Sequence, residues 1–108
     1  MEGIELIAFQ IIAAVGSARS NFVEAVRQAK IGEFEQAEKL IKEGEKFFLE
    51  GHKAHSTLIQ KEASEAKSEV SLILLHAEDQ LMSAETLKIV ADELIEVHRE
   101  LTELKNHQ

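Results

Sequence analysis

The absence of proline limits the fold of this 108-residue chain more than any other feature. Proline and glycine mark most turns, and the chain has only five glycines. Its body consists of Glu, Ala, Leu, Lys and Ile, whereas the residues that favour strands are sparse and all five aromatic residues are Phe. Strands and tight turns are hard to build from such a composition. We therefore predict an all-α fold.

Two interruptions divide the helical pattern. Residues 30–33 end one amphipathic segment and start another, and Gly32 can adopt the left-handed conformation that closes a helix. Large apolar residues are missing for about nine positions in the stretch 60–68, where Ser64 or Ser68 could cap the next helix. The prediction is a single domain over residues 1–108, an antiparallel three-helix bundle with helices at about 4–29, 33–60 and 67–105.

Charge and composition exclude several classes of function. The formal net charge of −8 disfavours sequence-independent binding to nucleic acid phosphates or anionic lipid. The absence of cysteine excludes disulfides, thiolate zinc sites and cysteine nucleophiles, and it fits the reducing cytoplasm. The longest apolar runs, 11–15 and 72–75, are much shorter than the ~20 residues of a membrane span. Met1 to Gly3 lacks a basic region, so we expect no signal peptide and no membrane insertion.

The third predicted helix carries two apolar faces. At 100° per residue, one face suits the core of a three-helix bundle. A second apolar face lies roughly opposite, and a three-helix bundle has no second core to receive it. Such a face normally marks an interface, so we expect a homo-oligomer that associates through this helix. The first face comprises Val70, Ile73, Leu74, Ala77, Leu81 and Ala84, and the second comprises Leu72, Leu75, Met82, Ile89, Val90, Val97 and Leu104.

Asp79 lies in the middle of the second face and is one of only two aspartates in the chain. A carboxylate among apolar side chains is costly unless it is paired or bound to a metal. One interpretation is an ordinary surface aspartate beside a narrower apolar face. The other is a symmetry axis at which copies of Asp79 meet, sharing a proton or binding a hard cation such as Mg²⁺.

His76 precedes Asp79 by one turn, at the edge of the same face. A histidine on a helix is usually a packing or surface residue, but a neutral imidazole is also a nucleophile toward phosphorus. His52 and His55 have the i, i+3 spacing of a metal chelate without a placed third ligand. His98 and His107 lie near a helix C-terminus, where a cation complements the helix dipole.

Three glycines, Gly16, Gly44 and Gly51, fall inside predicted helices, where each costs up to ~1 kcal/mol relative to alanine. Close helix packing is the simpler explanation. Small residues on the first helix, from Ala13 to Ala18, could instead leave room for a bulky group such as a phosphorylated side chain.

Four segments resemble, in the same order, the lactose/cellobiose (chitobiose) enzyme IIA family of the bacterial phosphoenolpyruvate-dependent sugar phosphotransferase system. Residues 70–82 are closely similar to the family's "VSLxLxHAQDHLM". Residues 16–20 resemble its "AGxARS" and residues 29–34 its "A-x-x-G-D-F", and His52 followed by Leu58 and Ile59 resembles its "AH-x-x-Q-T-x-L-I". The resemblance covers nearly the whole chain.

The resemblance implies a homotrimer whose third helices meet along the threefold axis. It implies that His76 takes a phosphoryl group from the histidine phosphocarrier protein HPr and passes it to a cysteine of the cognate enzyme IIB. Enzyme IIB in turn supplies the permease, enzyme IIC, which imports a β-disaccharide. By position, Asp79 is the metal ligand, with one Mg²⁺ per trimer on the axis. The alternative is a structural helical homo-oligomer without phosphoryl transfer, which gives no reason for His76 and Asp79 to stand together.

Two positions depart from the family pattern. The family has Gln where this chain has Glu78, and His where it has Gln80. A Gln amide can donate a hydrogen bond to a phosphoryl oxygen, whereas an ionised Glu would repel it. Gln80 can donate but cannot take up a proton as His can. The roles of these two positions are left open by the sequence.

Overall fold

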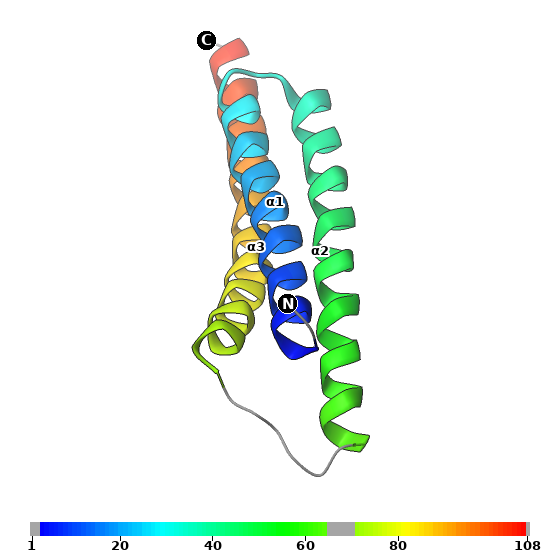
Figure 1. The fold of residues 1–108 in the computed structure, drawn as a ribbon. Coiled ribbons are helices and arrows are strands. Elements are labelled where there is room, and N and C mark those ends of the chain that lie inside the picture. Colours follow the sequence, from blue (N-terminus) through cyan, green and yellow to red (C-terminus); the bar gives the residue numbers. More distant parts are fainter. Residues whose placement is uncertain (1–2, 65–70, 108) are drawn as a thin grey trace.

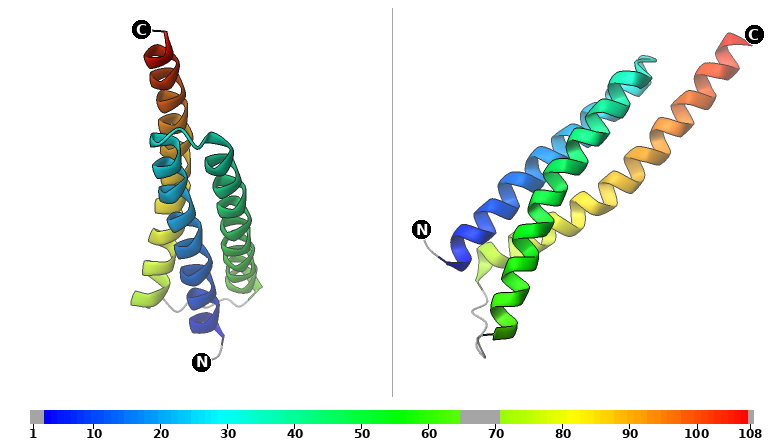
Figure 2. Two further views of the ribbon diagram at one scale, coloured as in Figure 1. Left: turned by 90° about the horizontal axis from the view of Figure 1, so that it is seen from above. Right: turned by 90° about the vertical axis from the view of Figure 1, so that its right-hand side faces the viewer.

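The chain folds as three long helices that run antiparallel to one another in sequence order (Figure 1). The computed structural model describes residues 3–64 and 71–107. The helices are α1 (Ile4–Lys30), α2 (Phe34–Ser64) and α3 (Leu72–Asn106). In the left view of Figure 2, the lower part of α1 lies between α3 and α2. The predicted all-α three-helix bundle is confirmed.

The connection between α1 and α2 has the geometry that the sequence predicted. Gly32 has φ of 82°, in the left-handed region. The amide of Glu33 donates a hydrogen bond to the carbonyl of Gln28 at 2.9 Å. The amide of Gly32 donates one to the carbonyl of Ala29 at 3.0 Å. This pair of hydrogen bonds is the Schellman motif, which satisfies the last carbonyls of a helix. The predicted boundary at residues 30–33 is therefore correct.

The start of α3 differs from the prediction. Ser71, not Ser64 or Ser68, caps the helix, because its extended backbone lets its hydroxyl accept a hydrogen bond from the amide of Leu74 at 3.2 Å. Ser64 is instead the last residue of α2, which continues beyond the predicted end at 60, and its hydroxyl donates to the carbonyl of Lys61. Ser68 and the predicted helix start at 67 lie outside the described residues.

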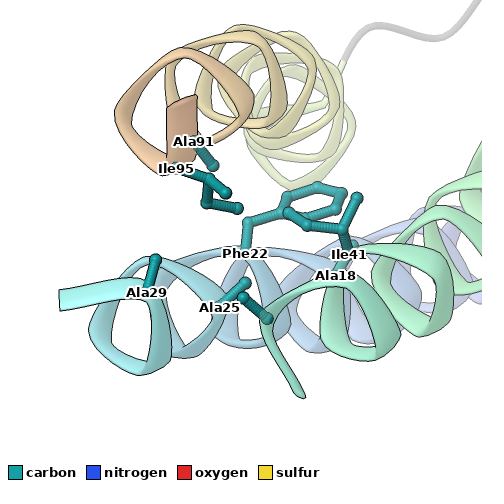
Figure 3. Packing of buried hydrophobic residues seen from close by; sticks show 8 residues of the cluster. Ala18, Phe22, Ala25, Ala29, Ile41, Ala91 and Ile95 are labelled. Atoms are coloured by element: carbon teal, nitrogen blue, oxygen red, sulfur yellow. The ribbon is translucent and has the colours of Figure 1, made fainter. Parts of the chain in front are cut away.

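The buried residues of α1 alternate at spacings of three and four. This pattern keeps a single seam of side chains facing two neighbouring helices. Phe22 is the largest fully buried side chain and lies among Ala18, Ile41 and Ile95 (Figure 3). The buried residues of α1 are Ala8, Ile11, Val15, Ala18, Phe22, Ala25 and Ala29, and those of α3 are Leu74, Ala77, Leu81, Ala84, Ala91 and Ile95.

Two glycines of α2 allow this helix to approach α1 closely. A Cβ atom at Gly44 would lie 2.5 Å from Cε1 of Phe22, and one at Gly51 would lie 2.8 Å from Cγ2 of Val15. Close packing explains both residues. It does not explain Gly16, which is exposed and has no atom within 4 Å of where its Cβ would stand.

Polar side-chain contacts join α2 to α3 along the bundle. Lys88 of α3 bonds to Glu45 of α2 at 3.1 Å and to Asp92 of its own helix at 2.8 Å, Arg99 bonds to Glu38, and His55 bonds to Glu78. Hydrogen bonds to Asp92 and then to Glu45 raise the pKa of Lys88 above its ordinary value. Both Lys88 and His55 continue the three-and-four spacing of the buried residues on their helices, so polar pairs occupy positions within the seam.

One helix, α1, is long and apolar enough to cross a membrane by length and composition alone, with a mean hydropathy of 1.4 over 18 residues. The sequence prediction considered uninterrupted apolar runs, which are short in this chain. Seven apolar residues of α1 are buried in the core that this helix shares with α2 and α3.

We predict that Gly44→Ala lowers the free energy of unfolding by about 1–3 kcal/mol, because the added methyl group would force Phe22 or the α2 backbone to move. Urea unfolding at a fixed protein concentration measures the change. Gly16→Ala is the matched control and should be neutral or stabilising by up to ~1 kcal/mol, since its new Cβ meets open space. Equal effects of the two substitutions would contradict the close packing at Gly44.

Candidate functional site

The described surface of α3 retains a long apolar face that neither α1 nor α2 covers. Leu72 is 85% exposed and Met82 is 66% exposed, although both belong to a helix that contributes buried residues on its other side. Leu94 and Leu101 extend the face predicted from the sequence. The exposed residues of this face are Leu72, Leu75, Met82, Ile89, Val90, Leu94, Val97, Leu101 and Leu104.

His76 lies at the edge of this exposed face, as the fifth residue of α3. Its side chain is exposed, and no hydrogen bond joins it to another residue within the described ranges 3–64 and 71–107. Leu75 on one side of it is exposed, whereas Ala77 on the other is fully buried. The imidazole is therefore held on a rigid helix, with its nitrogens accessible to a reacting group.

Asp79 is also exposed and lies one turn after His76. It lines an open depression of about 460 Å³ between α1 and α3. The other residues that line this depression are Arg19, Met82, Ser83, Thr86, Leu87 and Val90. The carboxylate thus stands among apolar and hydroxyl side chains, with an arginine of α1 in the same depression.

Glu78, the first departure from the family pattern, faces away from His76. Residues two apart on a helix lie about 160° from each other around its axis. The carboxylate of Glu78 bonds to Nε2 of His55 on α2 at 2.7 Å for one oxygen and 2.8 Å for the other. This carboxylate is therefore directed to α2, and its charge does not face the imidazole of His76.

Gln80, the second departure, lies on the side of α3 that faces α1. Its Oε1 accepts a hydrogen bond from Nη1 of Arg19. Residues four apart on a helix are neighbours on its surface, so Gln80 stands beside His76. The amide oxygen is used for Arg19, and the amide nitrogen forms no hydrogen bond with another described residue.

The structure offers little support for a metal chelate at His52 and His55. Their rings lie 6.5 Å apart between centroids, His52 stacks on Phe48, and His55 bonds to Glu78. In the described part of the chain, no group of three His, Asp or Glu side chains is placed to hold a metal ion. His107 directly follows α3, as its predicted place near a helix C-terminus requires.

Two residues that contact this region were missed by reasoning from the sequence. Arg19 was noted only as part of a matching segment, and His55 only as half of a possible chelate. One signal in the sequence could have singled out Arg19, because it is a basic residue within a run of small residues on α1. The bonds to Gln80 and Glu78 required the three-dimensional packing.

Comparisons with known proteins agree with this arrangement. The family described as "PTS system, Lactose/Cellobiose specific IIA subunit" matches residues 6–99. The lichenan-specific phosphotransferase enzyme IIA component of Bacillus subtilis is 40% identical over 102 residues, which are 94% of this chain and 93% of the relative.

Two solved structures share the fold. The cellobiose-specific enzyme IIA of Bacillus anthracis superimposes with a TM-score of 0.89 and 37% identity, over 94% of each chain. The IIA(Chitobiose) protein of Escherichia coli, solved in complex with HPr, superimposes with a TM-score of 0.82 and 34% identity, over 94% of this chain and 99% of that one.

The fold and these similarities define a component of the sugar phosphotransferase system. The chain belongs to the lactose/cellobiose-specific IIA family of that system.

We predict that His55 and Glu78 stabilise the bundle as a coupled pair, with a coupling free energy of about 0.5–1 kcal/mol. A double-mutant cycle with His55→Ala, Glu78→Ala and the double variant, measured by urea unfolding, gives this value. A second cycle with His52→Ala and Glu78→Ala serves as the control. His52 lies one turn away on α2 and does not bond to Glu78, so its coupling should be near zero. Equal coupling in both cycles would contradict a specific pair.

Proposed function

We propose that this chain is a phosphocarrier that accepts a phosphoryl group on His76 from phospho-HPr and passes it to a cysteine of a cognate enzyme IIB. The observation that carries the proposal is the position of His76, which is exposed on a rigid helix one turn from Asp79 at the edge of an uncovered apolar face. The similarity to an Escherichia coli IIA protein solved with HPr supports HPr as the donor.

The chemistry required of His76 is simple. A neutral ring nitrogen attacks the phosphorus of the donor's phosphohistidine, a new N–P bond forms, and the donor's N–P bond breaks with its electron pair returning to the donor imidazole. In the second transfer, a thiolate of enzyme IIB attacks the same phosphorus and the electron pair returns to His76. Each step needs an in-line approach, which an exposed imidazole allows.

The surroundings of His76 suit transient complexes in the cytoplasm. The net charge of −8 favours docking on basic surfaces of partner proteins, because complementary charge increases the association rate. The sugar itself is handled by the permease, enzyme IIC, and we propose a β-disaccharide of the lactose, cellobiose or chitobiose type. None of the residues of this chain is required to contact it.

We predict that His76→Gln abolishes the uptake of label from phosphoenolpyruvate in the presence of enzyme I and HPr. Glutamine cannot act as the nucleophile, and an exposed residue can be replaced without loss of the fold. His52→Gln is the matched control and should leave labelling unchanged. Acid-labile label on His76→Gln would redirect the assignment to another histidine. A wild-type protein that takes up no label would favour the alternative, a structural oligomer.

We further infer that three copies associate through the exposed face of α3 around a threefold axis. Exposed apolar side chains run along nearly the whole helix, from Leu72 to Leu104. An apolar surface of this extent on one helix is typical of an interface and is rare on a monomer. The face lies on the side of α3 opposite its buried residues, so association would leave the bundle core unchanged.

The same association would bring together three copies of Asp79. One chain offers a single exposed carboxylate at this position, and the described residues of one chain hold no three-ligand group. Three copies around an axis would supply three carboxylates, whose oxygen atoms are the ligands that Mg²⁺ prefers. The donor type therefore fits one Mg²⁺ per trimer. When bound, the ion would neutralise carboxylates that otherwise repel one another within an apolar interface.

We predict that Asp79→Leu preserves or strengthens the trimer and removes its dependence on metal, because apolar side chains often replace buried charges without loss of stability. Asp79→Asn should also remove metal dependence, with a smaller gain in packing. Sedimentation equilibrium at micromolar concentration gives the oligomeric state. Thermal unfolding with and without chelator, together with elemental analysis, gives the metal dependence.

Two results would count against this assembly. A monomer mass for the wild type would contradict the trimer. An unfolding midpoint that chelator leaves unchanged, in a protein without bound metal, would show that Asp79 shares protons or faces water.

A further inference from the structure

Arg19 is placed beside the phosphoryl acceptor by a bond that spans two helices. It lies on α1, is half-buried, and donates from Nη1 to Oε1 of Gln80 on α3. Gln80 follows His76 by four residues, which makes the two side chains neighbours on the surface of α3. The guanidinium is therefore fixed next to the part of α3 that carries His76, on the side facing α1.

The charge of Arg19 is not offset by a carboxylate within the described residues. The chain holds two other arginines, and both form such pairs, Arg27 with Glu24 and Arg99 with Glu38 and Glu96. In a protein with 20 acidic residues, a half-buried guanidinium that bonds to a neutral amide is unusual. Asp79 lines the same depression as Arg19, yet no ion pair joins them. The cation remains available to an anion from outside the chain.

Among the residues that the structure describes, Arg19 is the one Lys or Arg that bonds to this stretch of α3. The sequence contains neither lysine nor arginine from Leu72 to Leu87. The other side chain shown to bond to this stretch from another helix is His55, which is engaged by Glu78 on the far side from His76. A phosphoryl group carries nearly two negative charges, and its transfer depends on neutralising its oxygen atoms. Arg19 is the residue whose placement meets this need.

Gly16 leaves the surface of α1 open one turn before Arg19. Gly16 lies three residues before Arg19 on α1, is exposed, and has no atom within 4 Å of where a Cβ would stand. By contrast, the space beside Gly44 is occupied by the side chain of Phe22, and the space beside Gly51 by that of Val15.

We propose that Arg19 is the cation that binds the phosphoryl group on His76, and that Gln80 positions its guanidinium for this task. The inference rests on the proposed function. A terminal N–H that Gln80 does not use donates to a phosphoryl oxygen, and Arg19 forms and breaks no covalent bond. The transfer itself remains the exchange of one N–P bond for another between donor and acceptor imidazoles. Gln80 acts through Arg19, by holding one of its nitrogens.

The test compares Arg19→Met with Arg19→Lys and with the control Arg27→Met, an exposed arginine of the same helix. Each variant is equilibrated with phospho-HPr, and the ratio of phosphorylated to free protein is measured, together with the rate at which isolated phosphoprotein loses its label. We expect Arg19→Met to lower the equilibrium constant for phosphoryl uptake about tenfold or more, the value typical of a lost charged hydrogen bond. Arg19→Lys should recover part of the loss, and Arg27→Met should match the wild type.

Gln80→Glu provides a second variant that leaves Arg19 in place. The new carboxylate would pair with the guanidinium, so the proposal requires lower phosphoryl uptake by this variant, and wild-type uptake would overturn the role of Arg19. Circular dichroism and sedimentation establish that each variant folds and assembles as the wild type does. If Arg19→Met does not fold, the phosphoryl uptake of Gln80→Glu and Arg19→Lys tests the role of Arg19.

The outcomes separate this inference from the function on which it rests. Wild-type uptake of the phosphoryl group by Arg19→Met, or by Gln80→Glu where Arg19→Met does not fold, would overturn the role of Arg19 while leaving His76 as the acceptor. Absence of label on the wild-type protein itself would overturn both proposals.

Discussion

The close contact between α1 and its two neighbours is the constraint on which the rest of the structure depends. Buried alanines on α1 and α3 and two glycines on α2 bring the helices near enough for Phe22 to fill the space that remains (Figure 3). Because packing of this kind tolerates little added volume, it fixes the rotation of each helix about its axis. The rotation of α3 in turn determines which of its residues are buried and which remain uncovered.

The position of the candidate site follows from that rotation. Ala77 is buried, so His76 is placed at the boundary between the α1 contact and the uncovered face, and Asp79 falls within that face. Gln80 is directed to Arg19 on α1, and Glu78 is directed to His55 on α2. The two departures from the family pattern thus lie on opposite flanks of the helix, and each has a partner on a different neighbour.

The sequence predicted the number of helices, their order, the turn at Gly32 and both faces of α3, because helical periodicity and glycine conformation are local properties. It misplaced the cap of α3, since Ser64, Ser68 and Ser71 have the same capping chemistry and the choice among them depends on where the backbone becomes extended. It did not predict the partners of Glu78 and Gln80, which come from other helices. The concern that Glu78 would repel a phosphoryl group arose because spacing alone does not show which way a charge is directed.

The start of α3 at Ser71 has an electrostatic consequence for His76, the proposed acceptor. The amino end of a helix carries a partial positive charge, and α1 and α2 each have a glutamate in the first turn that offsets it, Glu5 and Glu35. The first turn of α3 contains no acidic residue. Side chains on a helix lean toward its amino end, so a phosphoryl group on His76 would extend back over this first turn. If His76 is the acceptor, the partial positive charge of the turn would favour the phosphorylated form over the free one.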